Sequence, residues 1–297
     1  MAQSYDDVLQ PLTDVTTKLW LSPNTWKVNF GRGFSTKFID VASSTSLSDE
    51  GFKQTLTIPK YSIWSRGQQQ SLSVGIEIAA ETTTPAWILN PAVFHSAPGH
   101  ESKLLVPLQP DSDSLLGSPQ LTYSFTHPSL RVDVDATLEG KFIGLPATIK
   151  AASFIHPGWY AGVSSEYDAL RSGLKSYSVV FRHQLPAARR VPLLQNVFAF
   201  AQYGNRDGVA VSVVGNLEAN QSVSIATTVS KQVALVAAQF TCPRTASTVG
   251  ARVDLREQLV GITTSLLTRA GTIGLTLEVP NFVSIRSACL GFSYSNE

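Results

Sequence analysis

GVAVSVVGNLE, residues 208–218, alternates apolar and polar side chains along almost its whole length. Because side chains on a β-strand point alternately to opposite faces, this segment has one apolar face and one polar face. The apolar face is formed by Val209, Val211, Val213 and Leu217, and the opposite face by Ala210, Ser212, Asn216 and Glu218. TVGARVDLR, residues 248–256, repeats the pattern more sharply, with arginine and aspartate on its polar face. Both segments are predicted to be two-faced strands.

Segments of this kind recur from Leu72 to the C-terminus, each about as long as a strand that crosses a bilayer. The chain has little sequence left over that could cover so many apolar faces. A sheet closed into a barrel, with lipid outside and water inside, satisfies both faces and every backbone hydrogen bond. We therefore predict an all-β fold, a transmembrane β-barrel with an N-terminal amphipathic helix. A soluble β-sandwich that binds a ligand is the alternative.

The composition favours the membrane barrel. Charged residues make up 15% of the 297 residues, against about 25% in soluble proteins. Hydrophobic residues make up 43%, yet no apolar run approaches the roughly 20 residues that a membrane helix needs. The 23 Lys and Arg residues nearly balance the 22 Asp and Glu residues, whereas nucleic-acid-binding proteins usually carry a basic excess on one face. Nucleic acid is therefore not an expected partner.

The sequence offers no constellation for catalysis, a cofactor or a metal ion. Cys242 and Cys289 are too few for a disulfide framework or a metal cluster, and the five histidines are scattered. The Gly31-Arg32-Gly33 segment is two glycines short of a phosphate-binding motif. We expect neither enzymatic activity nor a cofactor.

Residues 4–20 form the one convincing helical stretch. A single apolar stripe recurs at helical spacing and includes Tyr5, Val8, Leu12, Val15 and Leu19. Ser4 is placed to cap the helix, with Asp7 at the second position of a capping box. Pro11 lacks an amide hydrogen and is expected to kink or interrupt the helix near its middle. The helix is predicted to lie on a membrane surface or against the inside of the barrel.

Strands are predicted almost without interruption after this helix, so residues 1–24 form the helical segment and residues 25–297 a single barrel domain. The predicted strands are 26–40, 52–64, 71–80, 86–94, 103–108, 120–127, 129–140, 146–155, 158–168, 175–184, 194–203, 208–218, 221–230, 233–241, 247–256, 259–268, 271–279 and 282–294. Residues 95–117 are the least regular region and are expected to decide the exact number. Aromatic residues at strand ends favour girdles at the two membrane surfaces, and these are Trp20, Trp26, Trp64, Trp87, Trp159 and Tyr160.

LVGITTSLLTRAG, residues 259–271, resembles the penultimate hairpin of the mitochondrial porins, the voltage-dependent anion channels. Members of that family carry a Leu-Ile-Gly start, a Thr-rich strand and a basic-Pro-Gly turn, in which Ala270 here replaces the proline. The residues 5–8, 12–14 and Lys18 resemble the amphipathic pore helix of the family. The resemblance implies a divergent member with about 19 strands, which is the number in the mitochondrial channel, and the predicted segments give about as many.

The last predicted strand resembles the insertion signal of mitochondrial barrels: a polar residue, a glycine two residues on, and two spaced hydrophobic residues. Ser287, Phe292 and Tyr294 match this pattern, whereas Cys289 occupies the glycine position. Residues 1–7 lack the positive start and the apolar core of a secretory signal, which favours an organelle membrane reached from the cytosol. Together with the resemblance, this predicts the mitochondrial outer membrane.

Charged residues on the polar faces are predicted to line the lumen, where they set the ion preference of a wide pore. The bases are Lys27, Lys37, Arg131, Lys150, Arg182, Arg252 and Arg256, with Lys18 on the helix; the acids are Glu77, Asp133, Asp135, Glu139, Glu166, Asp168, Glu218, Asp254 and Glu278. Because the acids at least match the bases, an anion preference is implied by the resemblance alone. Gating by the helix is likewise implied by the resemblance.

The leading hypothesis is a voltage-gated channel of the mitochondrial outer membrane for the diffusion of small ions and metabolites such as nucleotides. Two alternatives share the fold and stay open. One is the protein-import pore of that membrane, which an acid-leaning lumen favours, and the other is a barrel that serves as a structural subunit of a larger assembly. Membrane lipid is the expected partner throughout, and a homo-oligomer or a larger outer-membrane complex stays open.

Overall fold

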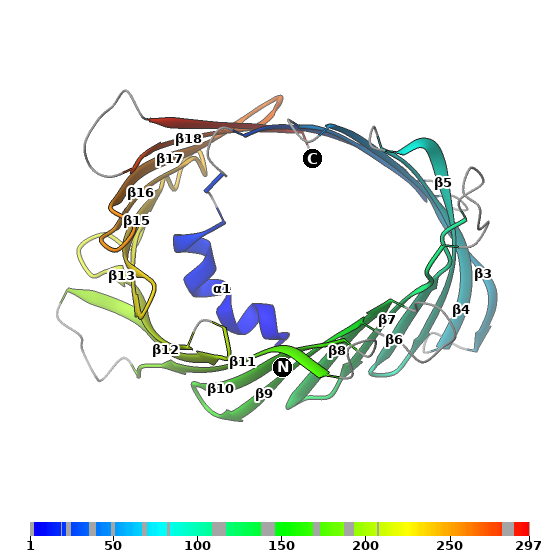
Figure 1. The fold of residues 1–297 in the computed structure, drawn as a ribbon, viewed down its shortest axis with the longest axis horizontal. Helices are drawn as coiled ribbons and strands as arrows, with labels where there is room; N and C mark the ends of the chain where they lie inside the picture. Colours follow the sequence, from blue (N-terminus) through cyan, green and yellow to red (C-terminus); the bar gives the residue numbers. More distant parts are fainter. Residues whose placement is uncertain are drawn as a thin grey trace.

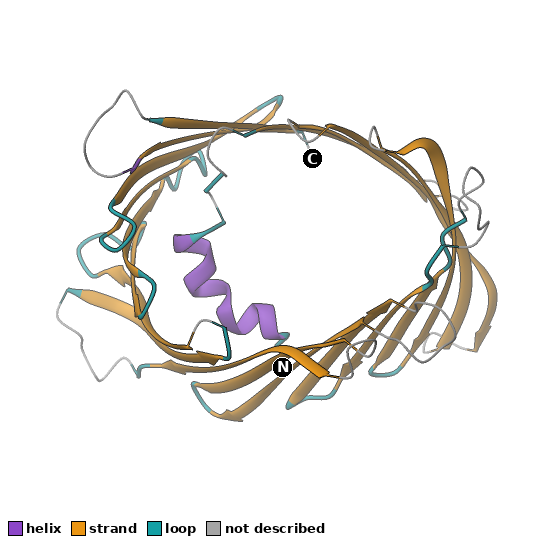
Figure 2. Cartoon of the chain, viewed as in Figure 1, coloured by secondary structure: helices purple, strands orange, loops and turns teal. Residues whose placement is uncertain are grey.

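The computed structural model describes residues 3–18, 20–21, 25–35, 40–48, 51–66, 70–81, 84–108, 117–137, 146–168, 173–186, 193–206, 208–280 and 288–296. Within these ranges, the α-helix is α1, Tyr5–Thr16, and strands make up most of the rest (Figure 2). The strands are β1 (Trp26–Ser35), β2 (Asp40–Ser48), β3 (Gly51–Arg66), β4 (Gln70–Glu81), β5 (Thr84–Ala97), β6 (His100–Leu105), β7 (Gln120–Thr126), β8 (Leu130–Thr137), β9 (Pro146–His156), β10 (Trp159–Asp168), β11 (Gly173–Gln184), β12 (Leu194–Gly204), β13 (Gly208–Leu217), β14 (Val223–Ser230), β15 (Ala234–Thr241), β16 (Thr248–Asp254), β17 (Leu259–Thr268), β18 (Gly271–Val279) and β19 (Cys289–Ser295).

The 19 strands form one sheet that closes on itself around α1 (Figure 1). Consecutive strands pair antiparallel, whereas β1 and β19 pair in parallel, from Trp26 opposite Phe292 to Asn29 opposite Ser295. An odd number of strands in a meander leaves the first and last strands pointing the same way, so closure requires one parallel seam. Because a closed sheet has no edge strand, its backbone groups are satisfied without water. The predicted barrel is confirmed, and the β-sandwich alternative is excluded.

The strand that brings the number to 19 is β2, which sequence analysis missed. The predicted first strand ran to residue 40, whereas β1 ends at Ser35 and β2 occupies Asp40–Ser48. The sequence of β2, DVASSTSLS, has only two large apolar residues and therefore a weak period-two signal. β2 forms a strand because its backbone pairs with β1 on one side and β3 on the other, although its side-chain pattern does not indicate one. The expectation that residues 95–117 decide the number was wrong, because β5 and β6 form an ordinary hairpin there.

The outer face of the wall is apolar. Strand register places one set of alternate residues away from α1, and in β13 this set includes Val211, which is 52% exposed. Exposed residues of the same kind recur around the wall, among them Phe30, Val163, Phe181, Val229, Val249, Ile262, Leu275 and Leu290. Leaving this surface in water would cost roughly 25 cal/mol for each Å². The wall is therefore suited to lipid, as the two-faced pattern predicted.

None of the helices in the described part of the chain has the length and hydrophobicity needed to span a membrane.

The inner face of the wall carries polar side chains as well as the apolar residues that α1 covers. Cross-strand hydroxyl pairs tie neighbouring strands together on this side, with Ser212 and Thr228 at 2.9 Å and Thr263 and Thr276 at 2.9 Å. The acceptor and donor roles are shared within each pair, so these groups are satisfied without a charge. The polar face of residues 208–218 therefore faces the lumen, as predicted.

α1 begins with the predicted capping box. The Asp7 amide donates to the Ser4 hydroxyl at 3.1 Å, and the Ser4 amide donates to the Asp7 carboxylate at 2.9 Å. The helix ends at Thr16, four residues before the predicted end at Trp20. Pro11 was predicted to kink or interrupt the helix; it does not interrupt it, because α1 runs through it from Tyr5 to Thr16. A partner on the barrel wall, described below, explains how the proline is tolerated.

Candidate functional site

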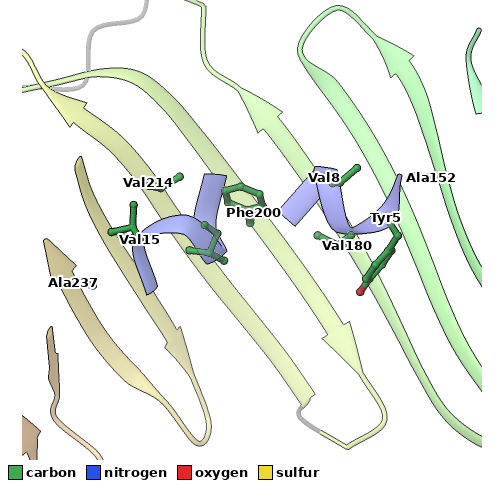
Figure 3. Packing of buried hydrophobic residues seen from close by; sticks show 10 residues of the cluster. Tyr5, Val8, Val15, Ala152, Val180, Phe200, Val214 and Ala237 are labelled. Carbon is green, nitrogen blue, oxygen red and sulfur yellow. The ribbon is translucent and has the colours of Figure 1, made fainter. Parts of the chain in front are cut away.

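The candidate site is the lumen, with α1 lying against one part of its wall. α1 packs on β9, β10, β11 and β13 to β15 (Figure 1). Its apolar stripe forms a cluster with inward-facing residues of those strands, and Figure 3 shows them facing one another. The members are Tyr5, Val8, Leu12 and Val15 from the helix and Ala152, Val180, Phe200, Val214, Ala226 and Ala237 from the wall. The predicted stripe is therefore a docking face inside the barrel, and Leu19 lies outside the described residues.

Small residues in the wall let the helix approach closely. Val8 is 0% exposed, and the wall residues of its cluster include Ala152 and Ala226. A Cβ at Gly162 would lie 2.8 Å from the Tyr5 ring, so this position has no room for a side chain. The Tyr5 hydroxyl then donates to the Ser178 hydroxyl at 3.0 Å. The N-terminal end of α1 is thus seated on β10 and β11.

Arg182 on β11 holds the helix through its backbone. Its Nη1 donates to the carbonyl oxygens of Asp7 at 3.1 Å and Val8 at 3.2 Å, and its Nη2 donates to the Gln3 side chain at 2.6 Å. The guanidinium lies over the Tyr160 ring at 4.2 Å. Arg182 was predicted to be a pore-lining charge. It does face the lumen, but it is only 4% exposed and is covered by the helix.

Two acidic residues of α1 hold its first turn: Asp6 contacts the barrel wall, and Asp7 contacts the residue that caps the helix. Lys150 on β9 donates to the Asp6 carboxylate at 2.8 Å. The pKa of the Asp7 carboxyl lies below its usual value, first because the Ser4 amide donates to it and then through the Ser4 hydroxyl. Arg131 and Arg182 add smaller Coulombic contributions of the same sign. The first turn of the helix is therefore fixed by charge as well as by packing.

The segment after α1 is anchored at a second point, on β16 to β18. The Trp20 ring lies 4.1 Å from the Arg252 guanidinium, and Arg252 in turn pairs with Glu278, which is 2% exposed. A Cβ at Gly261 would lie 2.6 Å from the Trp20 ring. Gly261, in the segment that resembles mitochondrial porins, is thus the floor of a socket for Trp20.

The prediction of aromatic girdles holds for part of the set. Trp26, Trp64 and Trp159 lie near strand ends and are 39%, 48% and 44% exposed, with Trp26 at one rim and the other two at the opposite rim. Trp20 and Tyr160 were assigned wrongly, because both lie inside the lumen next to arginines. The side chain of Trp87 lies outside the described residues. An aromatic residue at a strand end has two faces available, and only the register decides between lipid and lumen.

Most of the described lumen charges are paired with the opposite sign. Besides the Arg252–Glu278 and Lys150–Asp6 pairs, Arg131 donates to Asp133 at 3.1 Å. Lys18, on the exposed side after α1, pairs with Asp14 at 3.1 Å. On the strand register, Lys27 and Asp135 also face the lumen and are exposed. The described lumen therefore carries a mosaic of ion pairs without an evident excess of either sign.

Other predicted residues lie elsewhere or outside the described residues. Arg256 is in the turn between β16 and β17 and donates to the Lys231 carbonyl, so its assignment to a lumen-facing strand position was wrong. Asp254, the last residue of β16, accepts from the amides of Arg256 and Glu257 and holds that turn. Glu218 follows the end of β13. Lys37, Glu139 and Ser287 lie outside the described residues, as do the side chains of Glu77 and Asp168.

The C-terminal strand places the two described residues of the proposed insertion signal on the outer face. Phe292 is 39% exposed there, and the Tyr294 ring packs 5.8 Å from the Phe30 ring across the parallel seam. The Tyr294 hydroxyl donates to the Ala270 carbonyl at 2.6 Å. Both residues therefore contribute to the lipid-facing side of the seam.

Several inward-facing side chains remain open to solvent. Glu101, Thr122 and Asp135, on the lumen faces of β6, β7 and β8, are exposed. Cavities of about 460 Å³ and 250 Å³ flank α1, the larger between Leu12 and Thr16 of the helix and Leu235 of β15. A barrel packed solid with side chains would bury these groups. The described residues thus leave space for water beside the helix.

The sequence matches no family of known proteins and no curated protein. Among solved structures, the chain is similar to a triple mutant of the porin from Rhodobacter blastica, with a TM-score of 0.42 and 7% identity. That match covers 90% of this chain and 94% of the other. By the geometry of its own sheet, which is closed and carries apolar side chains outside, the chain is a β-barrel.

Proposed function

We propose that the protein is a channel of the mitochondrial outer membrane through which small ions and metabolites such as nucleotides diffuse. The observation that carries the proposal is the closed wall with lipid-suited residues outside and solvent-exposed polar residues inside. Such a wall separates the lumen from the lipid, and a water-filled lumen lets polar solutes cross the membrane. The mitochondrial location and the voltage-dependent closure rest on the sequence resemblance of residues 259–271 and of the N-terminal helix.

The lumen charges bear on ion preference. The described bases at positions 131, 150 and 252 each pair with an acid, and salt screens what remains of their fields beyond about 8 Å at physiological ionic strength. We therefore expect the channel to discriminate only weakly between anions and cations. The anion preference implied by the resemblance would then depend on residues such as Lys27, which is exposed on the lumen face of β1.

Planar-bilayer recording of the refolded full chain tests the proposal, with the reversal potential measured in a salt gradient. A large conductance that closes with voltage and shows a weak or anionic preference is the expected result. Cation preference with block by basic presequence peptides would assign the chain to the import-pore alternative. A correctly folded barrel without conductance would refute the channel and favour a structural subunit.

A further inference from the structure

Pro11 leaves one carbonyl of α1 without a helical donor. In an α-helix, the amide of each residue donates to the carbonyl four residues earlier, and proline has no amide hydrogen. The Asp7 carbonyl is the group that Pro11 cannot satisfy. Arg182, which projects from β11 of the wall, donates its Nη1 to this carbonyl at 3.1 Å. The wall thus supplies the hydrogen bond that the helix sequence has removed.

The guanidinium is held in place from the wall side as well. Its carbon lies 4.2 Å from the centre of the Tyr160 ring and 5.6 Å from that of the Phe198 ring. The same Nη1 reaches the Val8 carbonyl, and Nη2 reaches Gln3 just before the helix. A planar guanidinium can serve several acceptors at once, which a lysine ammonium on a flexible stem does less well. Arg182 is therefore oriented toward the helix and bound to its backbone at two successive carbonyls.

We propose that Arg182 is the residue that positions α1 on the barrel wall, and that Pro11 makes the helix dependent on it. Apolar packing has little directionality, so the apolar stripe alone does not fix the axial position of the helix on the wall. An unpaired carbonyl has a single matching donor, so the pair sets the axial position of the helix. In a channel, this position determines how much of the lumen the helix occupies; that consequence rests on the proposed function.

Hydrogen exchange of the α1 amides, read by mass spectrometry on the full chain in nanodiscs, tests the positioning without requiring conductance. Arg182→Gln removes the charge and the two carbonyl bonds. A hydrogen bond to a charged group is strong enough that its loss should speed exchange of residues 5–16 by about tenfold or more. Lys103→Gln is the matched control, since it also removes one lumen charge, on β6 beside Phe94, and should leave α1 exchange unchanged.

A double-mutant cycle with Pro11→Ala distinguishes positioning from a general structural role. Alanine restores the amide hydrogen, which can donate to the Asp7 carbonyl from within the helix. Arg182→Gln should then speed exchange several-fold less in the Pro11→Ala background than in the wild type. Equal effects in both backgrounds would overturn the proposed link between Pro11 and Arg182. If the Arg182→Gln barrel fails to assemble, the same cycle with Arg182→Lys gives the comparison.

Conductance recorded on the same variants separates the two proposals. Arg182→Gln should give frequent transitions between conductance levels, reduced again by Pro11→Ala. Slow exchange of α1 in every variant, in a channel that conducts, would overturn the positioning role of Arg182 and leave the channel intact. The expected exchange pattern in a barrel that never conducts would overturn the channel and leave the positioning role standing.

Discussion

Gly162 and Gly261 mark the two places where an aromatic ring from the N-terminal segment touches the wall. A Cβ would come within 2.8 Å of the Tyr5 ring at the first and 2.6 Å of the Trp20 ring at the second. Both separations are shorter than ordinary van der Waals contact, so a methyl group requires the ring to move. At these positions glycine is needed for close approach and not for an unusual backbone conformation.

Gly261→Ala is therefore expected to displace Trp20 from its socket and to weaken the contact with Arg252. Distances from a spin label on the α1 segment to a label on the outer wall, measured by electron paramagnetic resonance, should broaden in this variant. Gly250→Ala, on the neighbouring strand, is the control: its Cβ would press on the Thr263 methyl at 3.0 Å but lie 3.9 Å from the Trp20 ring, so it perturbs the wall without filling the socket. An unchanged distance distribution in Gly261→Ala would contradict the socket.

The lowered pKa of the Asp7 carboxyl group predicts how the first turn of α1 responds to acid. Its pKa is lower in the folded chain than the value of about 3.9 expected in an unfolded chain. The stabilisation is therefore fully present above that unfolded value and is lost as the pH falls through the folded pKa. Nuclear magnetic resonance of the α1 amides should be constant from about pH 7 to 5 and change below about pH 4. Asp7→Asn should flatten this response, whereas Asp14→Asn, on the exposed side, should preserve it.

At the scale of elements, α1 is an amphipathic helix too short and too exposed on one side to be stable alone. Isolated helices shorter than about 12–15 residues are marginal in water, and α1 has 12 residues with a proline inside. The capping box, the apolar stripe and the Arg182 bonds together offset that weakness. Its structure therefore depends on the wall of β9 to β15.

Removing one side chain from the stripe should release the helix in part. Leu12 is 6% exposed within the cluster, and Leu12→Ala is expected to weaken docking by about 2 kcal/mol or more. Single-channel recordings should show more open-channel noise, and α1 amides should exchange faster. Gln10→Ala, on the exposed face of the same helix, is the matched control and should behave as the wild type.

At the scale of the whole molecule, closure through the parallel β1–β19 seam gives every residue of the wall one of two environments. Val211 in the middle of β13 faces outward, and Thr122 in the middle of β7 faces the lumen. Because the two faces differ in solvent, the same substitution should have different consequences at these two positions.

Val211→Arg should destabilise the barrel by about 2–4 kcal/mol if the position lies near the bilayer midplane. Urea unfolding in phospholipid vesicles measures this change. Thr122→Arg should leave the unfolding midpoint nearly unchanged and shift the reversal potential toward anions. A large loss of stability from Thr122→Arg, with tolerance of Val211→Arg, would show that the faces have been assigned the wrong way round.

The sequence by itself determined the barrel, because a strand's period of two records which face meets lipid and which meets water. It also determined the helix start, since Ser4 and Asp7 need only each other and their own backbone. Strand β2 was not predicted because its serines give little contrast between the two faces, and its place depends on backbone pairing with β1 and β3.

Only the tertiary structure decided how the lumen is organised. Arg182 and Arg252 were both predicted to be pore charges. The fold instead places Arg182 against the backbone carbonyl of Asp7, 175 residues away, and Arg252 against the carboxylate of Glu278, 26 residues away. Trp20 and Tyr160 were predicted to lie at the membrane surfaces, whereas the structure places them in the lumen beside Arg252 and Arg182. The alternation along one strand shows only which face a residue lies on. The partner of a charged residue depends on which other segment the closed barrel places beside it.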